Sequence, residues 1–124
     1  MEELSSFSDE ILKPVGRVNY DLSLFIDIEK TINSLSHEMQ FELAKKIKSM
    51  EYDDFISSFY WKLLSLHIKK QSLHRCRFCN SNDILNVHHR SYEHHGYEYQ
   101  TYKTELVCIC EKCHNGLHKE EKNG

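Results

Sequence analysis

The chain is poor in proline and in long apolar runs. It contains one proline, Pro14, close to Gly16 in an expected turn, and it has no internal repeat and no low-complexity segment, which excludes a repeat protein. No stretch approaches the roughly 20 consecutive apolar residues that a membrane-spanning helix needs, so no membrane partner is expected. The first residues, MEELSSFSDE, are acidic where a signal peptide is basic, and we therefore expect a cytoplasmic protein.

Charge is distributed unevenly along the chain. Residues 1–61 contain 6 Lys and Arg against 12 Asp and Glu, whereas residues 62–124 contain 10 against 7, together with eight of the nine histidines. The two halves therefore have different functions. The 124 residues suffice for one modest core, and we expect an acidic, mainly helical segment over 1–58, a functional domain over 59–120 and a tail over 121–124.

Two patterns compete in the first half. Alternation of apolar and polar residues predicts a strand over residues 17–28, but a helical stripe follows it, formed by Ile28, Ile32, Leu35 and Met39. From Ser36, an expected N-cap, helical spacing predicts a helix whose apolar residues are Met39, Leu43, Ile47 and Met50. Asp53 or Asp54 is expected to cap a second helix, with one stripe made by Phe55, Phe59, Leu63 and Leu66.

The five cysteines favour a metal site over disulfides. Their number is odd, and in a chain without an export signal two Cys-x-x-Cys pairs indicate metal thiolates. Cys76 and Cys79 are separated from Cys110 and Cys113 by thirty residues, which leaves room for a β-hairpin between the pairs. Four thiolates form a closed tetrahedral site, typical of structural zinc. Cys108 is expected to point away as a buried thiol. The alternative is redox-active or merely buried cysteines.

The histidines lie between and after these pairs. Residues 83–90 are predicted to form a strand that ends in His88 and His89, residues 105–109 its partner, and residues 91–103 the long connection. His114 and His118 are four residues apart, so they share one face if that segment is helical and can bind one ion.

This set of motifs resembles the HNH endonuclease family over about residues 60–120. The resemblance rests on the two Cys-x-x-Cys pairs, Val-His-His-Arg, Glu-Leu-Val and the final histidines. It implies an α+β fold: a ββα-metal, treble-clef-like module with a four-cysteine structural zinc site, preceded by the helical segment. It also implies that His89 is the general base and that His88, His114 and His118 hold a catalytic divalent ion (Mg²⁺, Mn²⁺, Ni²⁺ or Zn²⁺). Glu105 stands where the family has the asparagine that pins the loop between the strands, and it is counted with His89 among the catalytic residues.

Such residues suit the hydrolysis of a phosphodiester. A neutral imidazole takes the proton of the attacking water, and a divalent ion stabilises charge on the phosphate and on the leaving oxygen. Because neighbouring residues of a strand point to opposite faces, His88 and His89 share a site only if the strand breaks, which we expect at His88. His94 and His95 are expected in a solvated or DNA-facing loop.

DNA is the expected partner of the second half. Basic residues precede and surround the first cysteine pair: Lys62, Lys69, Lys70, Arg75, Arg77 and Arg90. We expect Arg77 and above all Arg90 to contact phosphates, without a base-reading element. Two alternatives are a noncatalytic zinc-finger-like module that binds nucleic acid and an interaction protein whose acidic half recruits a protein partner. We expect the acidic first half to be a scaffold. The alternative is that it covers the active site as an acidic, autoinhibitory lid.

Overall fold

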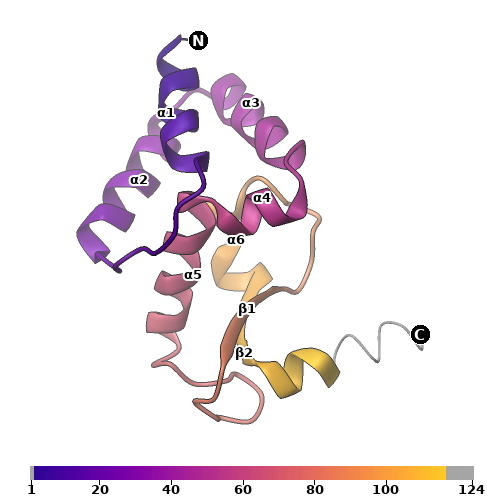
Figure 1. Ribbon diagram of the computed structural model, residues 1–124. Coiled ribbons are helices and arrows are strands. Elements are labelled where there is room, and N and C mark those ends of the chain that lie inside the picture. The colour runs from indigo at the N-terminus through magenta and orange to yellow at the C-terminus, as the bar shows by residue number, and fades with distance from the viewer. Residues whose placement is uncertain (1, 117–124) are drawn as a thin grey trace.

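The computed structural model describes residues 2–116 and is mainly helical (Figure 1). The helices are α1 (Glu2–Leu12), α2 (Leu22–Ser34), α3 (His37–Lys48), α4 (Tyr52–Ser57), α5 (Phe59–Gln71) and α6 (Glu98–Glu105). The strands β1 (Leu85–His89) and β2 (Leu106–Cys110) form one antiparallel pair, and another helix starts at residue 111. None of the helices within residues 2–116 is long and apolar enough to cross a membrane.

Helix α5 joins the two ends of the molecule. It contacts α1, α2, α4 and both strands, and Figure 1 shows α1, α2 and α3 at one end and the two strands at the other. One apolar cluster extends through both ends and includes Ile11, Phe25, Ile32, Leu43, Ile47, Phe55, Leu63, Leu64, Tyr99, Leu106 and Cys108. The acidic first half therefore packs into the same core as the second half, and no Asp or Glu side chain within residues 6–61 is buried.

The strand predicted over residues 17–28 is wrong, because helix α2 occupies Leu22–Ser34. The side chain of Asp21 caps this helix by accepting hydrogen bonds from the backbone N–H groups of Ser23 and Leu24. The buried positions are Phe25 and Ile32, seven residues apart on one helical face. The apparent alternation was misleading, since its later apolar members, Leu22, Leu24 and Ile26, are exposed.

The helix expected to be capped by Asp53 or Asp54 is divided into α4 and α5 at Ser58, and neither aspartate is a cap, because α4 already begins at Tyr52. Ser58 has extended backbone angles, and its buried hydroxyl donates to Phe55 O at 2.6 Å and accepts from Trp61 N at 3.2 Å, which ends one helix and caps the next. The segment around Pro14 lies against this break, where Phe59 N donates to the carbonyl of Lys13. By contrast, the helix predicted from Ser36 is confirmed, with Ser36 Oγ accepting from Met39 N.

The predicted pair of strands is present. Leu85 pairs with Cys110 and His89 with Leu106, close to the predicted bounds. One face of the pair carries Leu106 and Cys108 into the main core, and the other carries Val107 and Ile109 into a smaller cluster around the cysteines. The connection between the strands is not an open loop throughout, because α6 forms its second part and packs on β2.

Candidate functional site

Four cysteine sulfurs meet beside the two strands. The Sγ atoms of Cys76, Cys79, Cys110 and Cys113 all lie within 4.8 Å of one another, and these are the four residues predicted to bind metal. Cys76 and Cys110 are buried with Val107 and Ile109 in the smaller apolar cluster. The pairing of β1 with β2 thus brings together two Cys-x-x-Cys pairs that are thirty residues apart in sequence.

The electrostatics of this cluster suit a cation. Burial by itself raises the pKa of the Cys76 thiol, but backbone N–H groups directed at its sulfur, that of Cys79 first among them, lower it to about 6. Hydrogen bonds with the sulfurs of Cys110 and Cys79 raise the pKa of Cys113 to about 12, because neighbouring thiolates disfavour one another. A bound metal ion removes that conflict, since it stabilises all four thiolates together.

Cys108 is not part of this group. Its side chain is buried in the main core with Leu106, as a buried thiol was predicted to be, and not in the smaller cluster with Val107 and Ile109. Burial raises the pKa of the Cys108 thiol, which keeps it protonated and makes it a small apolar core residue.

Histidines gather around a cavity of about 620 Å³ at the end of β1. Its polar and basic lining consists of Ser65, Lys69, Asn86, His88, His89, Arg90, Ser91, His95 and His114. Aromatic and apolar residues complete the wall: Met50, Tyr52, Phe55, Ile56, Trp61, Val87 and Tyr92. No Asp or Glu within the described residues lines it, so its charged groups favour an anion.

His88 and His114 lie together in this cavity. Their ring centroids are 5.1 Å apart, although the two residues belong to β1 and to the helix that starts at residue 111. Neutral imidazoles are good ligands for divalent transition metals, so this pair can provide two ligands to one ion. The third predicted ligand, His118, lies outside the described residues.

His89 is buried and held on three sides. Its ring is stacked between Trp61, at 5.0 Å between centroids, and Tyr92, at 4.4 Å. Its Nε2 atom lies 3.0 Å from Glu98 Oε2, and its side chain is only 6% exposed. The predicted break at His88 is wrong, since β1 continues through His89. His88 and His89 still line the same cavity, because the strand ends beside it.

Glu98 is a buried carboxylate at the Nε2 edge of the His89 ring, and its side chain is 2% exposed. Its Oε2 atom also lies 2.5 Å from His95 Nδ1, and Oε1 accepts hydrogen bonds from Gly96 N and from the Tyr60 hydroxyl. Burial raises the pKa of Glu98, but the hydrogen bonds from the two histidines outweigh it and lower the pKa to about 2. Glu98 is therefore an ionised carboxylate inside the protein.

Glu105 fixes the loop between the strands. Its Oε1 atom lies 2.5 Å from His94 Nδ1, and its backbone oxygen accepts from Arg90 N. The hydrogen bond with Glu105 raises the pKa of His94. Glu105 thus holds the segment that follows β1 at two points, His94 and Arg90.

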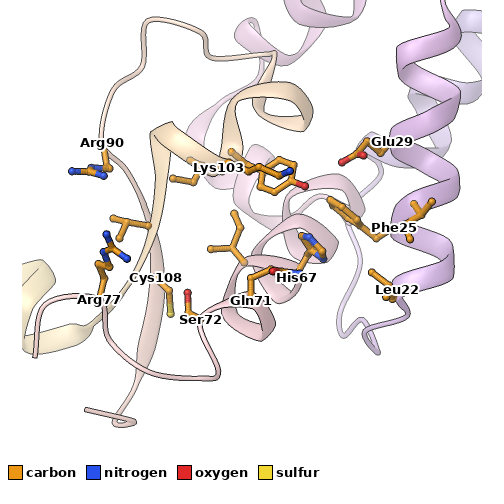
Figure 2. Close-up of a pocket in the computed structure, with 15 residues that line it drawn as sticks. Leu22, Phe25, Glu29, His67, Gln71, Ser72, Arg77, Arg90, Lys103 and Cys108 are labelled. Carbon is orange, nitrogen blue, oxygen red and sulfur yellow. The ribbon is translucent and has the colours of Figure 1, made fainter. Parts of the chain in front are cut away.

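The basic residues differ in what their side chains contact. Lys62 does not face a ligand site, because its ammonium group donates to the backbone oxygens of Val15 and Gly16. Arg77 and Arg90 line a second cavity of about 490 Å³ between α2, α5 and β2, and Arg90 also lines the histidine cavity. Figure 2 shows both arginines at one end of this second cavity and α2 at the other.

Comparisons with models of known protein families, with curated proteins and with solved structures found no match for this chain.

Sequence reasoning missed Glu98 and misplaced His95. Both lie in the predicted connection, where His95 was expected in a solvated or DNA-facing loop, yet it packs edge-on against Phe55 and pairs with Glu98. The available signal was local: Glu98 follows His95 by three residues and stands between two tyrosines. Nothing in that spacing indicated that the carboxylate would also reach His89.

Proposed function

We propose that this protein is a metal-dependent endonuclease of the HNH type that hydrolyses phosphodiester bonds in DNA. The observation that carries the proposal is the cavity at the end of β1, where His88, His89, His114 and Arg90 meet. Two antiparallel strands and a following helix supply these residues beside a cluster of four cysteines, the arrangement expected of a ββα-metal module.

The cysteine cluster is proposed to hold a structural zinc ion. Four sulfur ligands are the donor set that tetrahedral zinc prefers, and they leave no position for a substrate. The cluster ties the segment before β1 to the end of β2, and so it fixes β1, which carries His88 and His89, against β2.

His88 and His114, with His118 as the expected third ligand, are proposed to hold the catalytic ion. Bound there, a divalent ion would supply Lewis-acid stabilisation of the phosphate and of the leaving oxygen. Arg90 reaches the same cavity and can pair with a phosphate oxygen, while Glu105 orders the loop that follows Arg90.

His89 is proposed to take the proton of the attacking water. It lines the cavity next to His88, and the aromatic rings on both of its faces fix the plane of the imidazole. A base held in this way does not need to be oriented during the reaction.

A second candidate is a noncatalytic module that binds nucleic acid. It is favoured by the low exposure of His89, whose side chain is 6% exposed and bonded to a buried carboxylate, as a purely structural histidine would be. Under this alternative the basic cavity binds a phosphate backbone and the histidines only support its wall.

Cleavage of supercoiled plasmid DNA with Mg²⁺, Mn²⁺ or Ni²⁺ distinguishes the two candidates. We expect nicked or linear product with the wild type, and a rate lower by about 10²–10⁴-fold for His89→Ala, the typical contribution of a general base. His37→Ala, an exposed substitution in α3, is the matched control and should cut at the wild-type rate. Plasmid binding without cleavage under all three metals would establish the binding module instead.

A further inference from the structure

The buried carboxylate of Glu98 has all its acceptor positions in use. An ionised carboxylate is only an acceptor, with about four positions on its two oxygens. Oε1 accepts from Gly96 N at 2.9 Å and from the Tyr60 hydroxyl at 3.4 Å. Oε2 is shared by His89 Nε2 and His95 Nδ1. Each of these two ring nitrogens must therefore carry a proton.

This requirement determines which nitrogen of each neutral ring is free to act as a base. With Nε2 protonated, a neutral His89 ring has its lone pair on Nδ1. With Nδ1 protonated, His95 has its lone pair on Nε2. One carboxylate thus holds two histidines in opposite tautomers.

His89 lines the cavity, and its neighbours fix the orientation of its ring. Glu98 is buried at the Nε2 edge of the ring and does not line the cavity, whereas His89 does. Trp61 and Tyr92 are stacked nearly parallel to the imidazole, at interplanar angles of 12° and 16°. With the plane fixed by the aromatic rings and one edge fixed by Glu98, the ring has a single orientation.

We infer that Glu98 is a positioning residue, which holds His89 as the Nε2–H tautomer with its lone pair on Nδ1 towards the cavity. Its use in catalysis rests on the proposed nuclease function, because there Nδ1 is the atom that accepts the proton of water. The tautomer itself does not depend on that function.

The same three side chains lie close enough to one another to bind a metal ion. The hydrogen bonding favours instead a role for Glu98 in fixing the tautomers of His89 and His95, which we call the tautomer clamp. Gly96 N and the Tyr60 hydroxyl occupy Oε1, and both imidazoles face the other oxygen, Oε2. A metal ion would have to displace both ring protons and would leave Oε2 without its two donors.

Long-range ¹H–¹⁵N spectra of the full-length, zinc-loaded protein with labelled histidine test this directly. The ¹⁵N shifts of a neutral ring distinguish a protonated from an unprotonated nitrogen. We expect protonated Nε2 and bare Nδ1 for His89, and the reverse for His95, with signals assigned from His89→Gln and His95→Gln. A bare Nε2 on His89, averaged tautomers, or metal-bound shifts on both rings would overturn the inference.

Glu98→Gln tests the consequence for the reaction. Its amide keeps the shape of the side chain but offers one acceptor oxygen, so we expect tautomer averaging at His89 and a kcat lower by roughly 10²–10⁴-fold, with KM within about twofold. Glu93→Gln, an exposed substitution in the same loop, should change neither. If Glu98→Gln does not fold, the wild-type spectrum still shows whether His89 has the expected tautomer. If the wild-type protein does not cleave DNA but shows the expected tautomers, the tautomer clamp is upheld and the proposed nuclease function is refuted. If the wild-type protein cleaves DNA but His89 has an unprotonated Nε2, only the tautomer clamp is refuted.

Discussion

Gly96 is the position where one added methyl group should disturb the histidine site most. It lies between His95 and the start of α6, and it has φ of +103°, a backbone conformation that residues with a side chain rarely adopt. An added Cβ would lie 2.9 Å from the Cα, the Cβ and the backbone oxygen of Ala44 in α3. None of these atoms is the end of a flexible side chain, so the loop or the helix would have to move.

Two effects combine in Gly96→Ala. The left-handed backbone costs about 1–3 kcal/mol for a residue with a Cβ, and overpacking against Ala44 costs typically about 1–3 kcal/mol. We therefore expect unfolding free energy to fall by about 3 kcal/mol, which for a chain of 124 residues lowers the Tm by about 10 °C. Plasmid cleavage should fall as well, because Gly96 N donates to Glu98.

Thermal denaturation of the zinc-saturated protein, followed by circular dichroism, measures this effect. Gly16→Ala is the matched control, since nothing lies within 4 Å of its added Cβ and its backbone is not left-handed. It should melt within about 2 °C of the wild type. A Gly96→Ala protein that melts as high as Gly16→Ala would refute the close contact between this loop and α3.

Three further perturbations test other parts of the structure. Elemental analysis should find one zinc per chain in the wild type and in Cys108→Ser. Cys110→Ser should contain no zinc and should unfold, and zinc retained by this variant would contradict the assignment of the four cysteine ligands. Ser58→Ala should lose about 1–2 kcal/mol in urea denaturation, because it removes the cap of α5 and a bond to Phe55 O; an unchanged midpoint would mean that the break between α4 and α5 is set elsewhere. Glu98 has a folded pKa of about 2, below its ordinary value of 4.5, so its ionised form should stabilise the fold by about 3 kcal/mol above pH 4.5 and lose that contribution as the pH falls towards 2. The stability difference between wild type and Glu98→Gln should shrink over that interval, and a difference independent of pH would contradict the ionised carboxylate.

Some features followed from the local sequence because their physical causes are local. The helix from Ser36 combines a capping hydroxyl with an apolar face at helical spacing, and both act within a few residues. The strands were found because apolar runs flank the connection, and the Cys-x-x-Cys pairs because metal chemistry restricts thiolate spacing.

Other features could not be predicted, because several local patterns were equally compatible with the sequence. Residues 17–28 satisfied both a strand and a helix, and the decision came from the burial of Phe25 against α5 together with the cap at Asp21. The stripe from Phe55 to Leu66 did not show the break at Ser58, which depends on pairing with the chain near Pro14, more than forty residues earlier.

By itself, the sequence determined the four cysteines of the cluster, the pair of strands that brings them together and the placement of His88 and His89 at the end of the first strand. Only the tertiary structure decided the environment of His89: the ring between Trp61 and Tyr92, and the buried Glu98 beneath it. The reason is that ligand spacing and strand alternation are properties of neighbouring residues. The partner of a buried carboxylate, by contrast, depends on how α5, α6 and β1 pack, which no local pattern encodes.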